Sequence, residues 1–147
     1  MYLVSACLAG VNCRYNGENS AHETICELVK QGKAIPICPE QLAGLPTPRA
    51  CCEIIIDKSG NKKIVSKDGQ DFTKKFIEGS EKTLEIAKII GVEKAILQSR
   101  SPSCGYGSIY DGTFSGELKE GTGFTAELLT KNGIEVYIEN DLDKLEL

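Results

Sequence analysis

Three short apolar stretches of this 147-residue chain each lead to a cysteine. The stretches and their cysteines are 2–6 with Cys7, 34–37 with Cys38, and 94–98 with Cys104. A short apolar run bounded by turn-forming residues predicts a buried β-strand. In an open parallel sheet the carboxyl ends of the strands lie along one edge, and ligands bind there. We therefore expect the three thiols to converge on a single site.

The segment that follows the third stretch, Ser-Pro-Ser-Cys-Gly at 101–105, concentrates reactive groups where that strand ends. Pro102 lacks a backbone donor and so stops a strand, and Gly105 permits a backbone conformation that a bulky residue would resist. The thiol of Cys104 and the hydroxyls of Ser101 and Ser103 should therefore be presented at the edge of the sheet.

Between these strands the apolar pattern changes to a helical period, which predicts connecting helices. Residues 25–29 have helical spacing, with Ser20 as the expected N-cap. Residues 71–90 form the longest helical pattern, although Gly79 interrupts it, and residues 134–138 predict a final strand. This alternation of strands and helices is typical of α/β proteins with a parallel sheet.

Other segments depart from that alternation. Residues 54–65 contain two short strands around a turn and predict an antiparallel hairpin. The glycine-rich residues 106–116 predict a long loop that covers the ligand, because loops of this length are usually functional. We expect Thr122 or Thr125 to cap the next helix, and the acidic tail from Glu139 to be loosely held.

Length and charge narrow the classes of protein that this chain can be. The predicted fold is α/β: a single three-layer, Rossmann-like domain over residues 1–147, with a small, mainly parallel sheet and a hairpin insertion. A net charge of −4 argues against binding to nucleic acid, which needs clustered Lys and Arg, and favours a small ligand. No apolar run approaches the roughly 20 residues of a membrane span, so a soluble, cytoplasmic protein is expected.

The chain has seven cysteines, which in a reducing compartment mark metal binding or catalysis more often than disulfides. Zinc ligands usually arrive as C-x2-C pairs, and redox thiols as C-x-x-C near a βαβ unit. Neither pattern occurs among Cys7, Cys13, Cys38 and Cys104. An iron-sulfur cluster tolerates long separations between its ligands, whereas a buried cysteine can also be a simple apolar residue. Spacing alone leaves cluster, packing, zinc and redox roles open.

Seven motifs, in order along nearly the whole chain, resemble those of one family. They are Val-Ser-Ala-Cys-Leu-Ala-Gly at 4–10, Cys-Arg-Tyr-Asn-Gly at 13–17, Cys-Pro-Glu at 38–40, Gly-Leu-Pro-Thr-Pro-Arg at 44–49, Asp-Gly at 68–69, Ser-Pro-Ser-Cys-Gly at 101–105 and Tyr-Asp-Gly-Thr-Phe-Ser-Gly at 110–116. Together they are similar to the thiouracil desulfidases, a family long labelled only a domain of unknown function.

The resemblance implies a 4Fe-4S cluster that is bound by three cysteines and keeps its fourth iron open to the sulfur of a thiolated pyrimidine. We assign Cys7, Cys38 and Cys104 as the ligands, because each follows a predicted strand. Cys13 lies in a matching motif and could replace one of them.

The reaction that the resemblance implies is hydrolytic and non-redox: thiouracil and water give uracil and hydrogen sulfide. A thiophilic iron would stabilise the departing sulfur, and water must lose a proton as it attacks the ring. The resemblance implies one carboxylate and one serine in these roles, which match Glu40 as general base and Ser101 as the residue that orients water or donates to the sulfur or ring. Glu53 and Ser103 are the second choices.

The remaining polar and thiol side chains have weaker claims to a chemical role. Arg14 and Arg49 stand beside turns and are expected to anchor loops through carbonyls or a carboxylate. The tyrosines that could either stack on a pyrimidine or pack are Tyr15, Tyr106 and Tyr110. The cysteines expected only to pack are Cys26, Cys51 and Cys52.

A protein of another class remains an alternative to the enzyme. A binding module that carries a cluster or sulfur to a partner could present the same thiols without turning over a thiopyrimidine. Action on thiolated tRNA would call for a basic surface or an added nucleic-acid domain, and neither is evident in the sequence.

Overall fold

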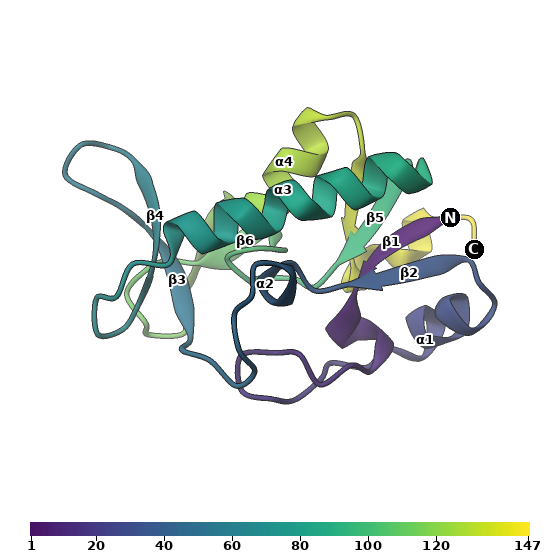
Figure 1. Ribbon diagram of the computed structural model, residues 1–147, viewed down its shortest axis with the longest axis horizontal. Coiled ribbons are helices and arrows are strands. Elements are labelled where there is room, and N and C mark those ends of the chain that lie inside the picture. Colours follow the sequence, from purple (N-terminus) through teal and green to yellow (C-terminus); the bar gives the residue numbers. More distant parts are fainter.

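The computed structural model describes residues 1–147 and has a four-stranded parallel sheet at its centre (Figure 1). The strands lie in the order β2-β1-β5-β8. Their bounds are Tyr2–Ser5 for β1, Ala34–Ile37 for β2, Lys94–Leu97 for β5 and Glu135–Ile138 for β8. Each predicted core strand is therefore present, and all neighbouring pairs are parallel.

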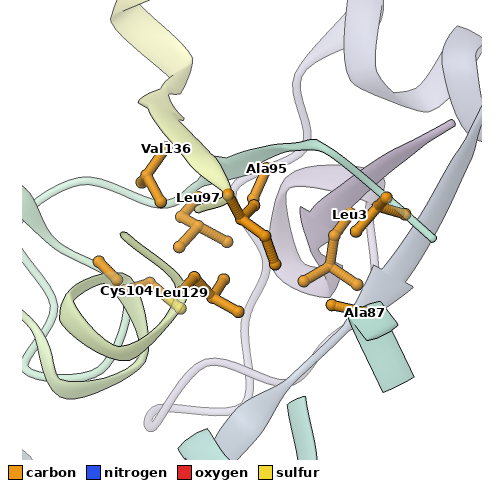
Figure 2. Packing of buried hydrophobic residues seen from close by; sticks show 10 residues of the cluster. Leu3, Ala87, Ala95, Leu97, Cys104, Leu129 and Val136 are labelled. Carbon is orange, nitrogen blue, oxygen red and sulfur yellow. The ribbon is translucent and has the colours of Figure 1, made fainter. Parts of the chain in front are cut away.

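Successive side chains of the central strands point to opposite faces of the sheet, and helices cover both faces. Leu3 packs under α3 and α4 (Figure 2). Val4 packs on the opposite face against α1. The bounds of the covering helices are Glu23–Lys30 for α1, Thr73–Ile90 for α3 and Phe124–Lys131 for α4. The predicted three-layer α/β arrangement is confirmed.

Two antiparallel hairpins lie outside this sheet. The first pairs β3 (Cys52–Ile56) with β4 (Lys62–Ser66) and is the predicted insertion. The second pairs β6 (Tyr106–Tyr110) with β7 (Leu118–Thr122). The prediction of a long structureless loop over 106–116 was therefore wrong. Ile109 is the only fully buried residue of these two strands, so the apolar alternation that signals a strand is missing from the sequence.

Two predicted helix caps were also wrong. Helix α1 starts at Glu23, and the Ser20 hydroxyl instead accepts a hydrogen bond from Gln98 at 3.4 Å. Helix α4 starts after Gly123, while Thr125 is fully buried inside its first turn. Both side chains resemble caps in sequence, but their partners come from distant segments.

The acidic tail is packed rather than loosely held. Residues Glu139–Lys144 form a 3₁₀ helix, η2, and Leu145 is buried in the same cluster as Val4. The Glu139 carboxylate accepts hydrogen bonds from the backbone N–H of Ser99, at 2.9 Å, and from its hydroxyl. None of the helices combines the length and apolar character needed to cross a bilayer.

Gly79 does not interrupt α3, which runs unbroken for 18 residues. It lies where the short helix α2, Pro39–Leu42, crosses α3. A Cβ atom at this position would lie 2.2 Å from the backbone oxygen of Pro39, so only glycine permits the contact. This close approach fixes the segment that follows Cys38 and carries Glu40.

We expect Gly79→Ala to destabilise the protein. In an exposed helix this change would help by up to about 1 kcal/mol, but here the overlap with Pro39 should lower the free energy of unfolding by about 1–3 kcal/mol. Urea denaturation measures the change, with Lys88→Ala on the exposed face of α3 as the control. A Gly79→Ala protein as stable as the wild type would contradict this account of the helix crossing.

Candidate functional site

The site lies where the strand order changes direction. From β1 the chain passes to β2 on one side of the sheet and later to β5 and β8 on the other, so a crevice opens beyond the carboxyl ends of β1 and β5. Cys7, in the 3₁₀ turn Ala6–Ala9 after β1, donates a hydrogen bond to the side-chain oxygen of Gln98 after β5. The backbone N–H of Gln98 in turn donates to the Ser5 hydroxyl at 2.9 Å.

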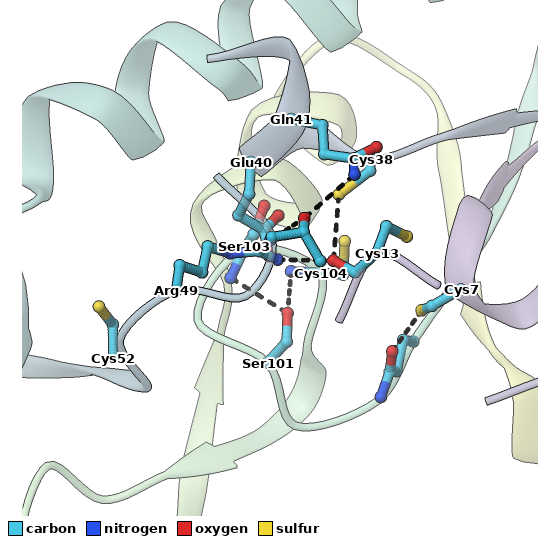
Figure 3. Close-up of polar contacts among 12 residues, drawn as sticks. Cys7, Cys13, Cys38, Glu40, Gln41, Arg49, Cys52, Ser101, Ser103 and Cys104 are labelled. Carbon is cyan, nitrogen blue, oxygen red and sulfur yellow. Dashed lines mark hydrogen bonds and ion pairs between the residues drawn. The ribbon is translucent and has the colours of Figure 1, made fainter. Parts of the chain in front are cut away.

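A cavity of about 460 Å³ opens at this point. Six of the seven cysteines line it: Cys7, Cys13, Cys38, Cys51, Cys52 and Cys104. The structure thus brings the expected three thiols together, with Cys13 beside them (Figure 3). Their convergence follows from the parallel strands, because β1, β2 and β5 all end at the same edge. The roles of these residues stay a prediction.

The thiols at the centre of the site are held in their neutral form. The pKa of Cys38 is raised by its hydrogen bond with Cys13, by burial and by the charge of Glu40. The pKa of Cys13 is about 11, because the hydrogen bond with Cys38, which lowers it, is outweighed by that with Cys7 and by burial. Burial, and then the charge of Glu40, raise the pKa of Cys104. A metal group bound here would have to displace protons from its thiol ligands.

The donor set suits an iron-sulfur cluster better than a hard cation. Soft thiols select thiophilic metals, and the only carboxylates lining the cavity are Glu40 and Glu53. No group of three or more Cys, His, Asp and Glu side chains is arranged to hold a single metal ion. A cluster differs from a single ion in placing several iron and sulfide atoms between its thiolates. The residues present therefore fit such a group.

Glu40 has one carboxylate oxygen bonded and one free. Its Oε2 accepts from Arg49 at 3.2 Å, in an ion pair whose side chains are only 14% and 8% exposed. Arg49 also donates to the backbone oxygen of Cys13 at 2.9 Å and to that of Pro46 at 3.3 Å. This confirms its predicted role as a loop anchor. Glu40 Oε1 is buried at the cavity without a hydrogen-bond partner, so it is available to accept a proton.

Ser101 shapes the turn that carries Cys104. Its Oγ accepts from the backbone N–H groups of Cys104, at 2.7 Å, and Ser103, at 3.2 Å. Both contacts use the oxygen as acceptor, so the hydroxyl proton of Ser101 remains free to donate at the cavity, which this residue lines.

The second choices for the catalytic pair are engaged elsewhere. Glu53, 5% exposed, accepts from the backbone N–H of Gly112 and of Phe114 at 3.0 and 3.1 Å. The Ser103 hydroxyl, 1% exposed, pairs with that of Thr125 at 2.8 Å. Glu53 Oε1 and the Ser103 hydroxyl therefore each have a structural partner, as Glu40 Oε2 and Ser101 Oγ do.

The cysteines predicted only to pack differ from one another. Cys52 is buried against Ile54 in a core cluster, as expected. Cys51 is exposed, so packing does not explain it. Cys26 lies outside the cavity, and its thiol points to the backbone oxygen of Leu8 at 3.8 Å.

Sequence reasoning missed several residues of the cavity wall. The missed residues are Lys67, Gln98, Arg100 and Phe114. Of the side chains with weaker claims, Arg14, Tyr15 and Tyr110 also line the cavity, whereas Tyr106 does not. Gln98 could have been found, because it is the polar residue that ends a predicted strand. Arg100 and Phe114 have positive φ angles of 70° and 57°, which no sequence pattern signals.

Arg49→Met should lower the free energy of unfolding of the metal-free protein by about 2–4 kcal/mol, because it leaves the Glu40 carboxylate buried without its partner. Lys62→Met, which breaks an exposed pair with Glu127 at 3.5 Å, is the matched control and should cost about 0–1 kcal/mol. Urea denaturation of both variants measures the two losses of the free energy of unfolding. Equal losses would show that the Glu40–Arg49 pair contributes no more than a surface contact.

Comparison with known proteins identifies the family of this chain. A family model described as 2-thiouracil desulfurase matches residues 2–141. The chain is 47% identical to the uncharacterized protein YbbK of Bacillus subtilis (strain 168) over 150 residues, which cover 99% of each protein. It is also similar to the solved structure of the 4Fe-4S-dependent thiouracil desulfidase TudS, with a TM-score of 0.89 and 38% identity over 98% of this chain and 93% of that one. This likeness confirms the predicted α/β fold.

Proposed function

The chain belongs to the 2-thiouracil desulfurase family and is an enzyme that acts on carbon–sulfur bonds, and on that premise we propose that it hydrolyses thiouracil or a related thiolated pyrimidine. The products are the oxygenated pyrimidine and hydrogen sulfide. The observation that carries the proposal is a single cavity in which clustered thiols meet a carboxylate oxygen that has no partner. The family model and the solved structure confirm the family resemblance inferred from the sequence motifs. The reaction itself is our proposal.

Cys7, Cys38 and Cys104 would hold a 4Fe-4S cluster in this cavity. The solved relative is described as 4Fe-4S-dependent, and these three thiols follow strands that end at one edge of the sheet. When bound, the cluster would supply a thiophilic Lewis acid suited to stabilise the charge on the leaving sulfur. Cys13 is the alternative ligand, since it lines the cavity and its backbone oxygen accepts from the Cys38 thiol at 3.9 Å.

Glu40 would act as general base. Glu40 lines the cavity and its buried Oε1 has no hydrogen-bond partner, while Arg49 holds Oε2, so one carboxylate oxygen would be left to accept the water proton. Ser101 would donate its free hydroxyl proton to the sulfur, the ring or the water. A hydrogen bond aimed at the place where charge develops lowers the barrier without any rearrangement during the reaction.

The reaction balances without an oxidant or reductant. The oxygen of water bonds to the ring carbon, the carbon–sulfur bond breaks, and the electron pair of that bond leaves with hydrosulfide. Glu40 takes the proton that the water loses and can return a proton to the departing sulfur or the ring. We further propose that residues 1–147 act as one domain in the cytoplasm, since the proposed ligands must stay reduced.

Anaerobic reconstitution with iron and sulfide tests the cluster. We expect the wild type to become brown, with about four iron and four sulfide per chain, and Cys7→Ala, Cys38→Ala and Cys104→Ala to lose most of the visible absorption. Cys26→Ala, which changes the one cysteine outside the cavity, is the control. If Cys13→Ala bleaches the protein while one of the three does not, the ligand set must be revised.

Glu40→Gln should keep the cluster colour but reduce the rate of hydrosulfide release from thiouracil by about 10²- to 10⁴-fold, because the amide accepts no proton at neutral pH. The amide oxygen can still accept from Arg49, so the fold should persist. Glu127→Gln, on the exposed face of α4 beside Lys131, serves as control. Undiminished turnover by Glu40→Gln would remove this residue from the mechanism.

The carrier alternative makes a different prediction for the same protein. Colour and labile sulfide without release of hydrosulfide from any thiopyrimidine would favour a module that delivers a cluster or sulfur to a partner. Turnover of free thiouracil by the reconstituted wild type would exclude it.

A further inference from the structure

Two residues other than glycine have a left-handed backbone conformation, and both line the cavity. Arg100 and Phe114 are the only residues other than glycine with a positive φ, at 70° and 57°. A bulky side chain in this region is strained and persists only where its surroundings hold it, which happens most often at ligand sites.

Phe114 is not needed for the hydrophobic core. It is half-buried and belongs to none of the three core clusters, nor does it pack against them, unlike Phe72 and Phe124. Phe114 instead lines the cavity together with the clustered thiols. The molecule thus tolerates a strained backbone in order to place an aromatic side chain at the site.

Glu53 on β3 holds this strained segment. Its buried Oε1 accepts from the N–H groups of Gly112 and Phe114, which is a charge-assisted contact to two donors of one turn. Gly112 has φ of +92°, and a Cβ atom there would lie 2.8 Å from the oxygen of Ile54. The tip of the β6–β7 hairpin therefore lies directly on β3, and the carboxylate fixes the position of the Phe114 backbone.

We propose that Phe114, held by Glu53, is the residue against which the planar ring of the substrate stacks. The inference rests on the proposed function. Aromatic side chains bind nucleobases through their π-faces, and this contact needs no polar group. Glu53 is accordingly a positioning residue rather than the base.

Variants at position 114 separate stacking from simple packing. Phe114→Leu keeps an apolar side chain but removes the ring, whereas Phe114→Tyr keeps the ring. We expect Phe114→Leu and Phe114→Ala to raise the KM for thiouracil by about 10- to 100-fold, with kcat changed less, and Phe114→Tyr to stay near the wild type. The chain contains no tryptophan, so equilibrium dialysis of thiouracil against the reconstituted protein, with each variant placed in the slow Glu40→Gln background, gives the independent binding constant.

Variants at position 53 test the positioning role. Glu53→Gln keeps an acceptor for the two N–H groups and should bind nearly as the wild type, whereas Glu53→Leu should reproduce the KM increase of Phe114→Ala. Cluster absorbance and the midpoint of urea unfolding are recorded for every variant. A Phe114→Leu protein with the KM and dissociation constant of the wild type would overturn the proposal, whether or not its stability or iron content falls.

The wild type separates this inference from the proposed function. If it releases hydrosulfide from thiouracil and Phe114→Leu does so with the same KM, only the stacking role fails. If the wild type neither binds nor converts any thiopyrimidine, the proposed function fails and the stacking role with it.

Discussion

The in-register pairing of β1 with β5 at the centre of the sheet supports everything that the site contains. Val4 lies opposite Ile96, and the two strands then end together, so Cys7 and Gln98 meet beyond them. A shift of one residue along either strand would send its buried side chains to the other face and separate the thiols. The packing of Leu3 in one core cluster and of Val4 in the other, on opposite faces of the sheet, opposes that shift. The cavity is therefore a consequence of the core and not of the loops alone.

Around that edge, each element contributes a group because something distant holds it. Helix α3 accepts α2 through Gly79, which places Glu40, and Arg49 then ties Glu40 to the backbone of Cys13. The thiols lie in a buried setting that disfavours thiolate until a metal takes the place of the proton. The site combines neutral soft donors with one oriented carboxylate, which suits the removal of sulfur from a planar ring.

Much of the fold was accessible from local patterns. The core strands, the long helix and the β3–β4 hairpin were predicted because their apolar spacing is strong and their turns carry glycine. The β6–β7 hairpin was missed because Gly107 pairs opposite Gly121 and no alternation marks either strand. The tail was judged loose from its charge, yet Glu139 is held by Ser99, a partner some 40 residues away in sequence.

The amino-acid sequence alone sufficed to identify the parallel sheet, the cysteines at its strand ends and the family motifs. The apolar period marks each strand locally, and parallel strands carry the residues that follow them to one edge. Only the tertiary structure could distinguish Glu40, with a free buried oxygen, from Glu53, whose oxygen holds the hairpin tip. Both are glutamates close to a cysteine in the chain. Their difference depends on hydrogen-bond partners brought in from other elements, and such partners exist only once the chain has folded.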